Sequence, residues 1–184
     1  MNITFKFLIT FIFAVNLVYA NDARILEWDE MMPKGYVESL LDFNNSNNDF
    51  SASDSFSFDD DTEEAQSAYE ELRNKLSSAP IVPELNDQFV KIAGFIVPLD
   101  FDFDSETFQQ FLLVPYFGAC IHTPPPPSNQ IVHVTSKTAL KQEWLDYAVW
   151  VSGSLSTQSK DSQQAYAGYS MNGVELEEYT EESE

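Results

Sequence analysis

The chain of 184 residues is poor in two kinds of side chain, with one cysteine and nine Lys or Arg against 30 Asp or Glu. A single cysteine excludes an internal disulfide and a zinc site built from four cysteines. The shortage of basic residues argues against DNA, RNA or an anionic membrane surface as a partner, because phosphate groups are bound by clustered Lys and Arg. The composition therefore favours an acidic protein that binds neither nucleic acid nor anionic lipid.

The N-terminal apolar run is shorter than the ~20 residues that a membrane span needs. It covers residues 7–15 and follows the single cation Lys6, and small residues precede a cleavage point after Ala20. This pattern is typical of a secretory signal peptide over residues 1–20, which implies export to the periplasm without insertion in the membrane after cleavage. The alternative is an uncleaved anchor, but Asn16 interrupts its apolar stretch. Because no cysteine stands directly after the run, at the cleavage point, a lipoprotein anchor is excluded.

The length favours one domain, and composition divides the mature chain into four parts. The second part is rich in Asn, Ser and Asp and cannot offset its ordering entropy, so we expect a disordered acidic linker there. The four parts are an N-terminal segment at 21–43, the linker at 44–61, a helix plus β domain at 62–179 and an acidic tail at 180–184.

A helix is predicted to follow the linker, with Asp61 or Thr62 as its cap and Pro80 as its end. Its apolar stripe has helical spacing and comprises Ala65, Ala68, Tyr69, Leu72 and Leu76. We expect this stripe to pack on the domain; the alternative is that it recruits a partner.

From residue 81 onward the pattern indicates β structure. The predicted strands are 89–97, 111–116, 131–135, 149–155 and a pair of segments within 166–179, with a short helix between 138 and 145. Gly94 lies inside the first strand, where it predicts the sharp bend at which a small barrel turns a corner. These features predict a mostly β fold, a small OB-like barrel with an N-terminal helical segment. A small sandwich is the alternative.

The densest chemistry lies between residues 113 and 134. Cys120 and His122 are two apart, so in extended backbone they share a face, and thiolate plus imidazole suits Zn²⁺ or copper. His133 lies on the next strand and could approach the pair if the intervening loop folds back. These three residues form the predicted metal site, with zinc as the candidate cofactor. The alternatives are that Cys120 is a buried small hydrophobe, that His122 caps backbone carbonyls, and that His133 is an ordinary sheet residue.

Four consecutive prolines separate the two histidines and form a stiff segment that cannot donate ladder hydrogen bonds. We expect this segment to be a rigid wall, and the polar residues after it to lead back into the sheet. The predicted partner-binding loop comprises Pro124, Pro125, Pro126, Pro127, Asn129 and Gln130.

Several of these strings resemble a family of exported bacterial proteins that is known only as a domain of unknown function. They are VKIAGFIVPL at 90–99, FLLVPYFGACIHTPPPPSNQIV at 111–132, WDEMMP at 28–33, and the VWVSGSL and AGYSM strands. The resemblance covers most of residues 25–179. It implies a periplasmic or envelope protein, encoded near an ABC transporter of the lipoprotein-releasing type and near histidine-rich zinc-binding exported proteins. It implies no catalytic residue.

Two functions remain open from the sequence. One is a periplasmic, non-enzymatic accessory protein of an ABC-type transport system that binds or transfers zinc through Cys120 and His122. The other is a structural adaptor that docks on a membrane permease, with Cys120 buried and no metal. A Cys-His hydrolase or thiol oxidoreductase is disfavoured, because the chain has no second cysteine and no evident group to orient the histidine. The expected partners are an ABC transporter or a periplasmic zinc-binding protein.

Overall fold

The computed structural model describes residues 23–39, 63–118, 126–162 and 165–180. The predicted signal peptide, the predicted linker and nearly all of the predicted acidic tail lie outside these ranges. Within them, no helix has both the length and the apolar character that crossing a membrane requires.

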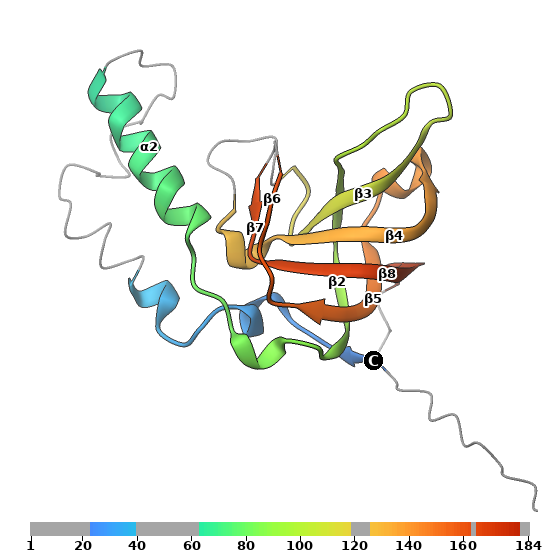
Figure 1. Cartoon of the computed structure of the whole chain (residues 1–184), viewed down its shortest axis with the longest axis horizontal. Helices are drawn as coiled ribbons and strands as arrows, with labels where there is room; N and C mark the ends of the chain where they lie inside the picture. The colour runs from blue at the N-terminus through green and yellow to red at the C-terminus, as the bar shows by residue number, and fades with distance from the viewer. Residues whose placement is uncertain (1–22, 40–62, 119–125, 163–164, 181–184) are drawn as a thin grey trace, which may run out of the picture.

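Long strands close into a barrel (Figure 1). Neighbours pair in the order β2-β3-β4-β8-β5, and β5 pairs back with β2. The β4–β8 pair is parallel and the other pairs are antiparallel. The strand bounds are β2 Phe89–Pro98, β3 Thr107–Val114, β4 Val132–Lys141, β5 Val149–Ser156 and β8 Tyr169–Glu178. The prediction of a mostly β protein with a small OB-like barrel is confirmed.

Gly94 lies where β2 changes partner. Residues up to Gly94 pair with β5, and residues from Phe95 onward pair with β3. A Cβ atom at Gly94 would lie 2.7 Å from the carbonyl oxygen of Val114, so the close approach requires glycine. The bend predicted at this residue is the corner of the barrel.

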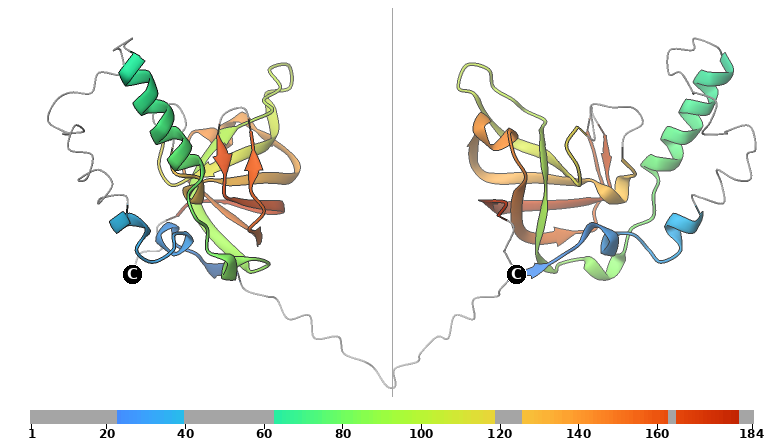
Figure 2. Two further views of the ribbon diagram at one scale, coloured as in Figure 1. Left: turned by 60° about the vertical axis from the view of Figure 1, so that its left-hand side comes forward. Right: turned by 180° about the vertical axis from the view of Figure 1, so that it is seen from behind.

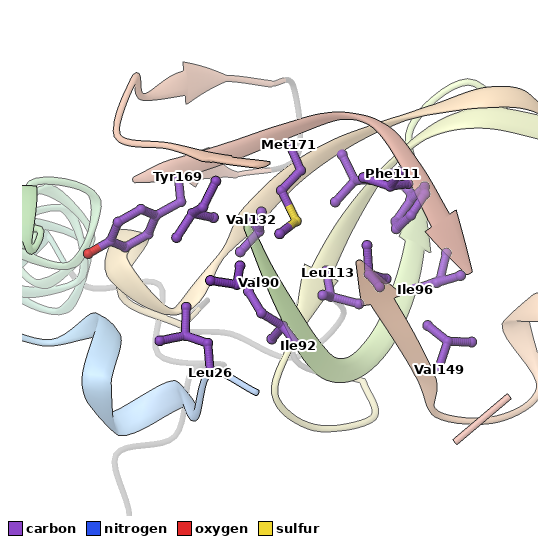
Figure 3. Packing of buried hydrophobic residues seen from close by; sticks show 14 of the residues in the cluster. Leu26, Val90, Ile92, Ile96, Phe111, Leu113, Val132, Val149, Tyr169 and Met171 are labelled. Atoms are coloured by element: carbon purple, nitrogen blue, oxygen red, sulfur yellow. The ribbon is translucent and has the colours of Figure 1, made fainter. Parts of the chain in front are cut away.

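The barrel interior is filled by alternating residues of the strands, as Figure 3 shows for the labelled set. In β2, Val90 and Ile92 are fully buried, and their neighbours in sequence face outward. Tyr169 closes one end of this core, because its ring is buried and its hydroxyl reaches two backbone groups. The hydroxyl donates to the Met31 carbonyl at 2.8 Å and accepts from the Val82 amide at 2.7 Å. It thereby fixes the N-terminal segment to the barrel.

Short elements surround the barrel. They are β1 Arg24–Ile25, the 3₁₀ turns η1 Trp28–Met31, η2 Pro83–Leu85, η3 Ser128–Gln130 and η4 Gln142–Leu145, and the hairpin of β6 Lys160–Asp161 with β7 Tyr166–Ala167.

The predicted long helix is present as α2, Glu63–Ser77, and it projects away from the barrel (Figure 2). Leu76, near its C-terminal end, is buried, whereas Tyr69 and Leu72 are half-buried. The predicted stripe therefore packs mainly through its last turn.

The helix predicted between residues 138 and 145 is wrong over its first half. β4 continues to Lys141 because Leu140 and Lys141 pair with Phe108 and Thr107 of β3. Only the single turn η4 follows. Leu140 is therefore buried as a strand residue opposite Phe108.

Candidate functional site

The candidate site is the segment that joins β3 to β4. The structure describes its two ends: residues 115–118, called here the entrance segment, and Ser128–Gln130, called here the exit turn. Four of the predicted site residues, Cys120, His122, Pro124 and Pro125, lie outside the described residues.

The entrance segment carries two exposed aromatic side chains. Tyr116 is 54% exposed and Phe117 is 72% exposed, directly after the fully buried Val114. The Phe117 ring makes an edge contact with Phe95 of β2, with ring centroids 5.8 Å apart. One side of Phe117 is therefore supported by the sheet and the rest faces solvent.

A second apolar cluster, separate from the barrel core, underlies this segment. In β3, Phe111 and Leu113 belong to the barrel core, so the alternate residues Leu112 and Val114 face the other way. Leu112 and Val114 are nevertheless fully buried, and Ile131 beside the exit turn joins them. The outer face of β3 thus gives both ends of the segment a common packed base.

The exit turn is polar and buried. Asn129 donates from Nδ2 to the Pro80 carbonyl at 2.8 Å, and Gln130 donates from Nε2 to the Trp28 carbonyl at 2.9 Å. Ser128 accepts at its carbonyl from the Gly168 amide at 2.7 Å. The turn therefore links the N-terminal segment, the chain after α2 and the start of β8.

The predicted partner-binding residues behave differently from one another. Asn129 is fully buried and Gln130 is 9% exposed, and both side chains donate hydrogen bonds within the chain. The Oδ1 of Asn129 is buried and has no partner among the described residues. Pro126 is buried and Pro127 is half-buried. The partner-binding role of the loop stays a prediction, and the exposed large apolar side chains in the described part of this connection are Tyr116 and Phe117.

Sequence reasoning missed these two aromatic residues as site residues. The sequence does contain a signal that could have identified them. The two aromatic residues lie between Pro115 and Gly118, two residue types that are typical of a turn. Two aromatic residues in such a turn have no strand face on which to be buried.

His133 lies on β4, between Leu112 of β3 and Ser170 of β8, and is half-buried. Burial is the main cause that lowers the pKa of its imidazole below the ordinary value of 6.5, and the positive charge of Lys160 lowers it further. The negative charge of Asp100 acts in the opposite direction. The ring is therefore neutral near pH 7, the protonation state in which imidazole binds metals.

Within the described ranges, no three His, Cys, Asp or Glu side chains are grouped so as to hold a metal ion. The metal site of Cys120, His122 and His133 stays a prediction, because its first two members lie outside those ranges.

Comparison with known proteins gives a family and one solved structure. A family model described as "Protein of unknown function (DUF3299)" matches residues 28–178. The chain is similar to the crystal structure of a DUF3299 family protein from Pseudomonas aeruginosa PAO1, with 30% sequence identity and a TM-score of 0.61. The likeness covers 88% of this chain and 99% of the other. No functionally curated protein matches.

Proposed function

Because the chain belongs to the DUF3299 family, whose function is unknown, we propose a function from the chain's own site. The protein is a periplasmic, non-enzymatic accessory protein of an ABC-type transport system. It docks on a membrane component of that system through the entrance segment and the proline-rich residues that follow. It is a binding module and performs no chemistry on its partner.

The observation that carries this proposal is the exposure of Tyr116 and Phe117. Buried aromatic anchors dominate the energetics of protein interfaces, and exposed apolar side chains gathered at one place mark such surfaces. Phe117 already contacts Phe95 in the free protein, so its side chain loses less conformational entropy when a partner binds.

The charge of the protein supports a protein partner over a lipid one. The net charge is −21, so anionic headgroups repel the molecule. A permease loop with basic residues would instead be attracted, because complementary charge speeds association and selects partners.

The test uses inner-membrane vesicles from the source bacterium and the purified full chain without its predicted leader. We expect saturable sedimentation of the protein with the vesicles, and loss of that binding in the double variant Tyr116→Ala/Phe117→Ala. Protease-treated vesicles and liposomes made from the extracted lipids should bind neither protein.

Phe103 provides a matched control. It is 85% exposed, but it precedes β3 whereas the entrance segment follows it, so roughly 25 Å of strand separates the two. Phe103→Ala should bind vesicles as the wild type does. Equal binding by the wild type and the double variant would exclude the entrance segment as the docking surface.

Zinc binding is the second candidate function, and the neutral imidazole of His133 favours it. Cys120 and His122 would supply the other protein ligands, and a remaining open position would suit transfer to a partner. Zn²⁺ should raise the melting temperature of the wild type by binding the folded state, and Cys120→Ser and His122→Ala should each abolish the increase. A melting temperature that zinc and copper leave unchanged would exclude this function.

A further inference from the structure

A pocket of about 370 Å³ lies between α2 and the β6–β7 hairpin, and neither Tyr116 nor Phe117 is among its lining residues. Glu70 and Arg73 of α2 form one wall, and Asp161 and Tyr166 of the hairpin form the other. Ile131, which is buried, lies behind the pocket lining between them. This volume is within the range of small-ligand sites.

The charged side chains that line this pocket form no ion pairs with other described residues. Arg73 has no ion-pair or hydrogen-bond partner in the described part of the chain, and neither carboxylate forms an ion pair there. Other basic residues of the same protein are paired, for example Arg24 with Glu30 at 2.7 Å and Lys91 with Glu177 at 2.7 Å. An unpaired guanidinium in the wall of a pocket is therefore free to bind a carboxylate.

The combination of charges selects the class of ligand. One guanidinium faces a pocket that also holds the carboxylates of Glu70 and Asp161, so a phosphate or another multiply charged anion would be repelled. A ligand with one carboxylate and one ammonium group would pair with both signs of charge. Asn74, which also lines the pocket, has a side-chain amide with no bonded partner in the described residues, and this amide could pair with a peptide group.

We propose that this pocket binds the zwitterionic form of a short peptide. The peptide carboxylate pairs with Arg73, and the ammonium group pairs with Glu70 or Asp161. The exposed ring of Tyr166 contacts small apolar side chains of the peptide. The site is independent of the docking role proposed for Tyr116 and Phe117, and either can fail without the other.

The test is a titration of the isotopically labelled full chain, without its predicted leader, with tri-alanine, followed by amide chemical shifts. We expect saturable shifts that include the amides of Ile131 and Tyr166. N-acetyl-tri-alanine and tri-alanine amide, which each lack one charge, should bind about fivefold more weakly, because a solvent-accessible ion pair contributes up to about 1 kcal/mol.

The variant Arg73→Gln should weaken tri-alanine binding about fivefold and leave the affinity for the amide unchanged. Lys75→Gln removes a cation from the same helix but outside the pocket lining, and it should bind tri-alanine as the wild type does. Absence of shifts at millimolar peptide, shifts located elsewhere, or equal affinity for the free and amidated peptides would each overturn the proposal.

Discussion

The two ends of the β3–β4 connection reverse the usual distribution of polar and apolar side chains. At the entrance segment, Tyr116 and Phe117 are apolar and exposed, at 54% and 72%. At the exit turn, Ser128, Asn129 and Gln130 are polar and buried, with none above 9% exposed. The exit turn therefore holds the fold together, whereas the entrance segment leaves apolar side chains in water, at the place where we propose that a partner docks.

The two side-chain amide donors of the exit turn have partners, whereas the buried Oδ1 of Asn129 has none in the described part of the chain. The side-chain amides of Asn129 and Gln130 donate to the backbone carbonyls of Pro80 and Trp28, which are distant in the sequence. Buried polar groups are costly only when they lack such partners. No comparable contact covers the far side of Phe117 in the described chain, so its apolar area stays in water. The first arrangement contributes to folding stability, and the second contributes less, through the contact of Phe117 with Phe95.

The largest effect on this comparison is expected from Gly168→Val. A Cβ atom at Gly168 would lie 2.8 Å from the Ser128 carbonyl oxygen and 3.0 Å from Cγ2 of Ile81, so the exit turn must move. We expect a loss of about 3 kcal/mol in the free energy of unfolding, measured by urea denaturation. Ser154→Ala, at an exposed position of β5, should change it by less than about 0.5 kcal/mol.

Asn129→Ala should have the next largest effect. It removes the bond to the Pro80 carbonyl and leaves that oxygen without its partner, which costs about 2 kcal/mol. Asn172→Ala, at an exposed position of β8, is the matched control and should be nearly neutral. If the two substitutions have equal effects on urea denaturation, the exit turn does not have the stabilising role assigned to it.

Substitutions at the entrance segment should cost less stability. Tyr116→Ala removes mostly exposed area and should change the free energy of unfolding by less than about 0.5 kcal/mol. Phe117→Ala also loses the edge contact with Phe95 and should cost about 1 kcal/mol. Thermal melting provides the measurement, and a loss at Phe117 as large as the loss at Asn129 would remove the distinction between the two ends.

The smallest effect concerns His133, beside the connection. Because burial lowers the pKa of its folded-state imidazole below 6.5, the unfolded chain binds more protons between the folded and unfolded pKa values. The stability of the wild type should therefore fall as the pH drops through about 6.5, and His133→Gln should flatten that part of the profile. Parallel profiles for the two proteins over this range would show that the imidazole is not linked to folding.

The sequence allowed the barrel to be predicted better than the site. Gly94 could be interpreted as a bend because a glycine inside a strand has few other causes. The sequence places Asn129 and Gln130 in a partner-binding loop because they follow the proline run directly and lead back into the sheet. Their actual bonds are to carbonyls 49 and 102 residues away, and no local pattern encodes contacts at that range.

The docking role of the entrance segment is tested most directly by crosslinking from a photoreactive phenylalanine analogue. The analogue is placed at position 117 in one protein and at position 103 in another, and each is illuminated with inner-membrane vesicles of the source bacterium. The account predicts a crosslink to one membrane protein from position 117 and none from position 103. Crosslinks of equal yield from both positions, or from position 103 alone, would contradict it.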